Sequence, residues 1–207
     1  MSSRRVRQHV NPLRSDLLSI DDVPRVEGPP GASLEVELGS AEAHFLMDRA
    51  VETPDRHYVG IEIRIEMVHK ANREAAHRGL AGKVRSVFAN ISVDMPRLFA
   101  PHSVSRFFVN FPDPWFKERQ HKRRVIDPSL VDDMLDALVD GGEIYVNTDI
   151  FELALDAMQA LEMNPGVRNV LSPWTFLRQS VFSSRSRRER QCERDGTKIW
   201  RLAYRRA

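Results

Sequence analysis

The regular alternation of strand-like and helix-like segments constrains the fold of this chain more than any other feature. Short apolar runs are separated by stretches with helical periodicity, and this order continues almost to the end of the sequence. Such alternation is typical of βαβ units and predicts a mostly parallel α/β sheet. We expect strands at residues 34–38, 57–63, 84–89, 106–111, 143–148 and 167–171, with 198–204 as a last edge strand. We expect helices at residues 41–51, 65–77, 94–99, 129–139 and 151–161, the fourth ended by Gly141 and Gly142.

The first residues do not fit this alternation. Residues 1–31 are polar and basic and are interrupted by Pro12, Pro24, Pro29 and Pro30. This composition predicts a flexible basic arm rather than a packed element. Residues 32–207 are expected to form a single domain, for which a chain of 207 residues provides a sizeable core.

Composition excludes several classes of protein. Cys192 is the only cysteine, which excludes an intrachain disulfide, and the seven histidines show no ligand spacing, so we assign no metal. The sequence has neither an export signal nor an apolar run long enough to cross a membrane. We therefore expect a cytoplasmic protein without a membrane partner, and leave open whether it is a monomer or a homodimer.

The basic residues are unevenly distributed. The net charge is only +2, but lysine and arginine cluster at residues 4–14, 117–124 and 185–206. Three such clusters suggest one face that binds a polyanion. Any single cluster could equally be a solvated helix face.

Polar residues gather where the predicted parallel strands end. Ligands of open α/β sheets bind beyond these carboxyl ends. Each carboxylate alone could cap a helix, but together they indicate a site, because unpaired carboxylates are costly to bury. The residues in question are Glu35, Gly39, Glu62, Asn90, Asp113, Thr148 and Asp149.

Glu62 indicates the kind of cofactor. It ends the second strand, 23 residues after Gly39, where an acidic side chain can accept hydrogen bonds from ribose hydroxyls. Residues 37–42 contain one glycine, and Glu37 and Glu42 would repel a pyrophosphate. The cofactor is therefore expected to have a ribose but no phosphate, and cationic S-adenosylmethionine fits this description.

The segment from residue 107 to residue 124 is the most unusual in the chain. An apolar strand ends at Pro112, Asp113 follows between two prolines, and after Trp115 five of the eight residues 117–124 are cationic. A carboxylate at a strand end beside a basic run suggests chemistry next to a surface for nucleic acid. Asp113 could instead be only a turn residue.

These residues also carry a family resemblance. Phe111-Pro-Asp-Pro-Trp-Phe-Lys117 and His121-Lys-Arg-Arg124 resemble the signature of the bacterial tRNA (guanine-N7-)-methyltransferases. The likeness extends over most of the chain, including residues 5–13, 34–36, 60–63 and 147–149, and residues 186–189 stand where the family has Thr-x-x-Glu.

The resemblance implies a Rossmann-like class I methyltransferase fold, with seven strands, an antiparallel last strand and helices on both faces. It implies methyl transfer from S-adenosylmethionine to N7 of a variable-loop guanine in tRNA. Asp113 would be the catalytic residue, stabilising the positive charge that develops on the base, or else orienting the base or binding the cofactor. By the same resemblance, S-adenosylmethionine would be bound by Glu35, Gly39, Glu62, Asn90 and Asp113. The guanosine would be held by Lys117, Asp149, Ser186 and Glu189, and the RNA backbone by Arg119, Lys122, Arg123 and Arg124.

Two departures from the family pattern leave alternatives open. Glu37 and Ala41 stand where the family usually has glycine, which alters the turn expected around the methionine moiety. One alternative is therefore a catalytically weakened relative that binds tRNA without efficient methylation. A small-molecule methyltransferase is the other, and the basic run at residues 117–124 disfavours it.

Overall fold

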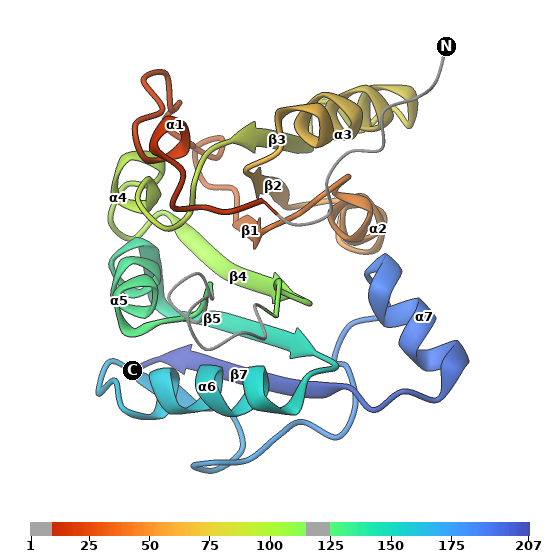
Figure 1. The fold of residues 1–207 in the computed structure, drawn as a ribbon. Coiled ribbons are helices and arrows are strands. Elements are labelled where there is room, and N and C mark those ends of the chain that lie inside the picture. Colours follow the sequence, from red (N-terminus) through yellow and green to blue (C-terminus); the bar gives the residue numbers. More distant parts are fainter. Residues whose placement is uncertain (1–9, 115–124) are drawn as a thin grey trace.

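The computed structural model describes residues 10–114 and 125–207 (Figure 1). Within these residues, seven strands form one sheet in the order β3-β2-β1-β4-β5-β7-β6. The strands are β1 (Leu34–Leu38), β2 (His57–Glu62), β3 (Val84–Phe88), β4 (Val104–Asn110), β5 (Leu138–Thr148), β6 (Val167–Asn169) and β7 (Trp200–Arg206). The helices are α1 (Ser15–Leu18), α2 (His44–Glu52), α3 (Ile65–His77), α4 (Met95–Leu98), α5 (Pro128–Ala137), α6 (Phe151–Glu162) and α7 (Arg187–Asp195).

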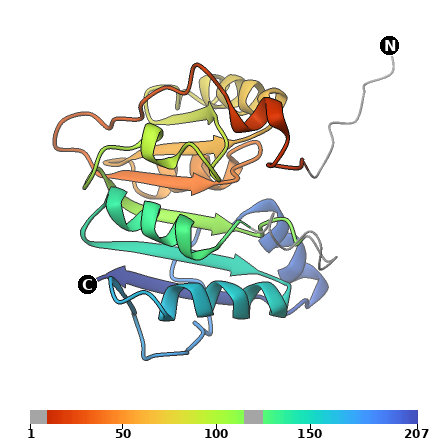
Figure 2. The ribbon, with the colours of Figure 1, turned by 60° about the vertical axis from the view of Figure 1, so that its left-hand side comes forward.

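The first five strands are parallel and β7 runs against them, which confirms the predicted fold class. In Figure 2 the parallel strands point toward the side where α1 and α7 lie, while β7 points the opposite way. The 198–204 segment was expected at the edge of the sheet. It is instead β7, paired with β5 on one side and with the three-residue β6 on the other, so β6 is the edge.

Side chains alternate between two cores, one on each face of the sheet. Phe107 and Val109 pack with residues of α4, α5 and α6, whereas Phe108 packs with α2 and α3. The same alternation applies along β1, where Val36 belongs to the first core. Glu35 and Glu37 therefore point to the face covered by α2.

Two of the differences from the predicted boundaries have a clear structural cause. The helix expected from residue 41 begins at His44, because Ala41 and Ala43 adopt left-handed backbone angles (φ 48° and 53°) and form a turn. The expected helix end at the glycine pair is wrong: α5 ends at Ala137, and Gly141 and Gly142 lie within β5, whose pairing with β4 is irregular there.

The described part of the N-terminal segment, residues 10–31, packs against the domain, unlike the flexible arm expected from its prolines. Val26 is fully buried, and its N–H donates to the carbonyl of Leu98 at 2.7 Å. The guanidinium of Arg97 donates to the carbonyls of Ile20 and Asp21, both at 2.8 Å. Backbone carbonyls satisfied by side chains of the domain explain why a proline-containing segment without regular structure is held in place.

Within the described residues, no helix is long and apolar enough to cross a membrane. No group of three histidine, cysteine, aspartate or glutamate side chains within them is arranged to hold a metal ion.

Candidate active site

A cavity of about 740 Å³ lies at the carboxyl ends of the parallel strands. Its walls are the segments that follow β1 to β5, together with residues of the N-terminal segment and the start of α7. The sheet order reverses between β1 and β4, and this is where open α/β sheets bind their ligands. Its volume is in the range typical of small-molecule sites.

Glu37, from the end of β1, lines this cavity and is only 3% exposed. Its Oε1 accepts a hydrogen bond from the Asn110 amide at 2.8 Å, and among the described residues its buried Oε2 has no partner. Burial raises the pKa of Glu37 to about 8; the Asn110 hydrogen bond opposes this rise, and the negative charge of Glu62 adds to it. A buried carboxylate oxygen without a partner is suited to a cationic or hydrogen-bond-donating ligand.

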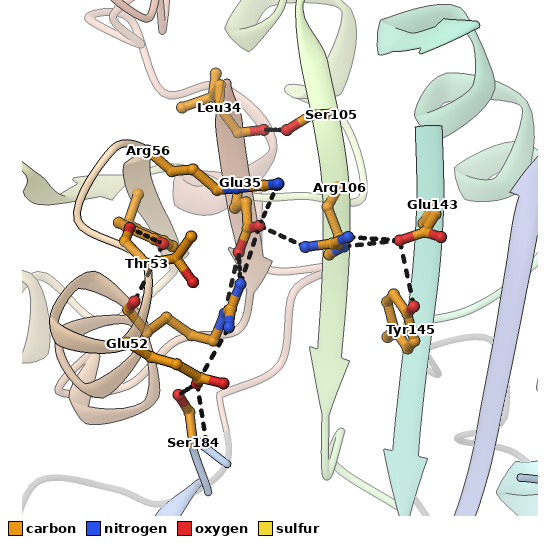
Figure 3. A network of polar contacts seen from close by, with 12 residues as sticks. Leu34, Glu35, Glu52, Thr53, Arg56, Ser105, Arg106, Glu143, Tyr145 and Ser184 are labelled. Atoms are coloured by element: carbon orange, nitrogen blue, oxygen red, sulfur yellow. Dashed lines mark hydrogen bonds and ion pairs between the residues drawn. The ribbon is translucent and has the colours of Figure 1, made fainter. Parts of the chain in front are cut away.

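Glu35, predicted as a cofactor ligand, is not among the residues that line the cavity. It is the second residue of β1, so it lies toward the amino end of the strand, and its carboxylate is fully buried. Arg49, Arg56 and Arg106 all bind that carboxylate, with N–O distances of 3.0, 2.8 and 2.5 Å (Figure 3). Glu35 and Glu37 share one face of β1 and differ only in their position along the strand. Glu35, nearer the amino end, forms structural ion pairs, whereas Glu37, nearer the carboxyl end, lines the cavity.

Glu62, at the end of β2, lines the cavity as predicted from its spacing. Its two carboxylate oxygens accept four hydrogen bonds: one from the N–H of Ala41 at 2.8 Å and three from Arg64, at 3.0 Å from the backbone and 2.8 Å from each of two guanidinium nitrogens. The Ala41 bond fixes the turn between β1 and α2. The three hydrogen bonds from Arg64 use the remaining acceptor positions of the Glu62 carboxylate.

The turn after β1 passes very close to β2. A β-carbon at Gly60 would lie 2.3 Å from the Oγ of Ser40 and 2.6 Å from its Cβ, so only glycine fits at this point of β2. Gly39, the predicted cofactor-binding glycine, has a left-handed backbone (φ 79°) and lines the cavity. Ala41 and Ala43 share that conformation, whereas Glu37 lies within β1, so the positions that glycine would suit in this turn include Ala41 but not Glu37.

Asn90, after β3, is fully buried and lines the cavity. Its amide nitrogen donates to the carbonyls of Pro12 and Leu17, at 2.8 and 2.9 Å, and its side-chain oxygen accepts from the N–H of Ser92 at 3.1 Å. Asn90 therefore fastens the N-terminal segment at the cavity, where Val10 and Pro12 form part of the wall. No sequence pattern around Asn90 predicts this second role.

Asp113, after β4, lines the cavity on the side opposite the β2 loop. The chain turns sharply before it, at Phe111, which has a left-handed φ of 52° and donates its N–H to the carbonyl of Asn147 at 2.7 Å. Hydrogen bonding to Glu62 raises the pKa of Arg64, and the nearby charge of Asp113 contributes to this rise. The charges of Glu62 and Asp113 thus both favour the charged form of Arg64.

The predicted guanosine-binding residues are only partly brought together. Asp149 and Ser186 line the cavity, and Asp149 accepts a hydrogen bond from Arg188 at 2.5 Å. Glu189 does not line it: its carboxylate is 1% exposed and binds Arg201 at 3.0 Å. Ser186 caps α7, because its Oγ accepts the N–H of Glu189 at 3.1 Å.

Helix α7 was missed, although Ser186-x-x-Glu189 is the pattern of a helix start and could have indicated it. Sequence reasoning also missed Glu37 as a cavity carboxylate and Asn110 as its hydrogen-bond partner. It likewise missed Arg64 and Arg188, which bind Glu62 and Asp149. The predicted RNA contacts Lys117, Arg119, Lys122, Arg123 and Arg124 lie outside the described residues.

Comparisons with known proteins agree on the kind of chemistry. A family model described as "Putative methyltransferase" matches residues 32–202. The tRNA (guanine-N(7)-)-methyltransferase of Synechococcus sp. (strain JA-3-3Ab) is 37% identical over 202 residues, covering 96% of this chain and 84% of the relative. That of Thermosynechococcus vestitus is 31% identical over 205 residues, covering 98% and 95%.

Among solved structures, geranyl diphosphate C-methyltransferase from Streptomyces coelicolor superposes with a TM-score of 0.56 at 13% identity, covering 86% of this chain and 76% of that one. TrmN from Thermus thermophilus gives a TM-score of 0.57 at 16% identity, covering 85% and 44%. At these identities the likeness shows the fold, which is that of the class I methyltransferases.

Proposed function

The chain belongs to the tRNA (guanine-N(7)-)-methyltransferase family, and from this premise we propose that it transfers a methyl group from S-adenosylmethionine to N7 of a variable-loop guanine in tRNA. The observation that carries the proposal is the acidic cavity at the carboxyl edge of the sheet, where Glu37 presents a buried oxygen that has no partner among residues 10–114 and 125–207. A cationic ligand with a ribose suits this cavity, and one with a pyrophosphate does not.

Glu37 and Glu62 would hold the cofactor, whose sulfonium supplies an activated methyl group. Glu37 offers its Oε2, which no described residue binds, to a cationic group. Glu62 offers its carboxylate to the ribose hydroxyls, and Arg64 must then give up hydrogen bonds to Glu62, because both oxygens are already saturated. In this proposal Glu37 binds the cofactor, a role that the sequence prediction assigned to Glu35.

The guanine would approach from the side of Asp149 and α7. Guanine N7 already carries a lone pair and no proton, so no residue has to act as a base on the nucleophile. Asp149 can accept hydrogen bonds from the N1–H and the 2-amino group of the base once Arg188 moves aside. Rigid placement of N7 in line with the methyl group supplies most of the acceleration, since orientation contributes about 7–11 kcal/mol.

Asp113 would act on the charge that methylation creates. Alkylation of N7 leaves a positive charge on the imidazole ring, and a fixed carboxylate stabilises it as it develops. Asp113 lines the cavity after a turn that the Phe111 hydrogen bond and Pro112 hold in place.

The catalytically weakened alternative is not favoured. One of its two premises was glutamate at position 37, where the family was expected to have glycine, and Glu37 lies within β1, where glycine is not needed. The other, Ala41, is accommodated with its N–H bonded to Glu62.

The proposal is tested by incubating the protein with labelled S-adenosylmethionine and an unmodified tRNA transcript. We expect label in the tRNA, and none when the variable-loop guanosine is replaced by 7-deazaguanosine, which lacks N7. Absence of label with folded protein that binds both substrates would refute the proposed function.

A further inference from the structure

Helix α2 contacts the segment that precedes α7, although the two are far apart in sequence. Glu52, the last residue of α2, accepts the N–H groups of Ser183 and Ser184, each at 3.2 Å, and also the hydroxyl of Ser184 (Figure 3). Partial burial acts to raise the pKa of Glu52, but the hydrogen bonds from Ser184 and Ser183 outweigh it and lower the pKa to about 2. The carboxylate is therefore ionised and fully engaged at neutral pH.

Glu52 is in turn held by a buried network. Arg49 binds Glu52 at 3.1 Å and also forms the ion pair with Glu35, and its side chain is 4% exposed. The ring of Phe182 lies against the Arg49 guanidinium, with 4.6 Å from the guanidinium carbon to the ring centroid. The same ring packs on Phe108 of β4. Residues 182–184 are thus fixed to α2 and to the sheet by charge-assisted hydrogen bonds and by aromatic packing.

The last residue that these contacts hold, Ser184, lies two positions before the first residue of this segment that lines the cavity. Ser184 is followed after one residue by Ser186, the cap of α7, and Ser186, Arg187 and Arg188 all line the cavity. Asp48, one helical turn before Glu52 on α2, binds Arg190 of α7 with both guanidinium N–O distances at 3.0 Å. One face of α2 therefore holds both the approach to α7 and its first turn.

We propose that Asp48 and Glu52 are positioning residues, which place residues 186–188 at the cavity and so determine how well the tRNA guanosine is bound, without contacting it. The inference rests on the proposed function for its consequence and on the contacts above for its geometry. Helix α2 also begins at the turn after β1, where the N–H of Ala41 binds Glu62. One helix therefore supports both the cofactor side and the guanosine side of the site.

The test compares Glu52→Gln with Asp55→Asn. Glutamine keeps the size of the side chain but replaces one acceptor oxygen by an NH₂ group, so at least one donor loses its acceptor and Arg49 loses the negative charge. Asp55 is an exposed carboxylate three residues away, so its variant controls for the loss of one negative charge near RNA. At saturating cofactor, we expect Glu52→Gln to raise KM for tRNA about tenfold, as for loss of a hydrogen bond to a charged group. The Kd for S-adenosylmethionine should stay within about twofold of wild type, and Asp55→Asn should match wild type in both values.

Limited trypsin digestion gives a readout that does not need activity. Cleavage at the arginines of residues 185–190 should be faster in Glu52→Gln than in wild type and in Asp55→Asn, because a segment that opens is cut. Asp48→Asn removes a half-exposed ion pair and should show the same two effects in smaller measure, which covers the case in which Glu52→Gln fails to fold.

Unchanged KM for tRNA and unchanged cleavage in folded Glu52→Gln and Asp48→Asn would overturn the positioning role. If the variants raised the KM for tRNA and the Kd for S-adenosylmethionine equally, the positioning role would also be overturned, since equal effects indicate that the whole site is disturbed. A wild-type protein without methyltransferase activity would refute the proposed function alone, because the cleavage comparison would still decide whether α2 holds the segment.

Discussion

Glu37 makes cofactor affinity depend on pH in a direction that can be worked out from its surroundings. Its pKa is raised to about 8 in the free protein, so at pH 7 only about one carboxyl in eleven is ionised. If the bound cation requires the ionised form, the apparent Kd is the intrinsic Kd divided by that fraction, about a tenfold weakening at pH 7. Binding then lowers the pKa of Glu37 and releases close to one proton.

The direction of the pH dependence follows from the protonation of Glu37 in the free and the cofactor-bound protein. The free carboxyl is mostly protonated below pH 8 and the bound one is ionised, so affinity rises with pH. Between pH 6 and 7 the Kd for S-adenosylmethionine should fall about tenfold, then by about a further fivefold to pH 8, and level off above pH 8. Titration calorimetry at pH 7 in buffers of different ionisation enthalpy should report about 0.9 protons released per cofactor bound.

Glu37→Gln is the matched perturbation. It should weaken cofactor binding, abolish the proton release and remove the pH dependence between pH 6 and 7. A raised carboxyl pKa also means that the folded state loses stability as pH rises from 4.5 toward 8. The variant should therefore melt higher than wild type at pH 8, by about 2–4 °C for each kcal/mol gained. A pH-independent Kd in the wild type, or an unchanged slope in Glu37→Gln, would refute this reasoning.

Three further outcomes are expected. Glu35→Gln leaves one buried and two partly buried arginines short of a partner and should cost about 3–5 kcal/mol of stability in chemical denaturation, while the folded fraction binds cofactor normally; weakened binding at full stability would return Glu35 to the cofactor site. Asp113→Asn should lower kcat about 100-fold with little change in the Kd for S-adenosylmethionine, and a kcat near that of wild type would argue against charge stabilisation. Asn90→Leu should release the carbonyls of Pro12 and Leu17 and speed hydrogen exchange across residues 12–18, whereas unchanged protection there would show that other contacts hold the segment.

Most of the fold could be predicted from the sequence because the apolar periodicity is strong. The strand at residues 34–38 and the helix at residues 65–77 have the predicted boundaries. The prediction failed where tertiary contacts override local pattern. Gly141 and Gly142 end no helix because the chain enters β5 at Leu138, and the 198–204 segment is internal because a short strand pairs with its outer side.

The site residues were likewise predictable where local pattern places them and unpredictable where tertiary contacts decide their role. Glu62, Asn90, Asp113 and Asp149 could be found because each lies at the end of a strand or within three residues of it, and the carboxyl ends of parallel strands meet at one edge. Glu35 and Glu37 could not be told apart by alternation, since residues two apart share a face of the strand. Their roles depend on which neighbours each meets, and the arginines around Glu35 come from three separate elements or loops.

The central claim is that this cavity brings a cationic methyl donor to N7 of a tRNA guanine. Nucleoside mass spectrometry of tRNA after reaction with S-adenosylmethionine tests it most directly. The predicted result is 7-methylguanosine in amounts that match the methyl groups transferred, located in the variable loop and formed about 100-fold more slowly with Asp113→Asn. Methyl groups on another base, or at another atom of guanine, would contradict the account.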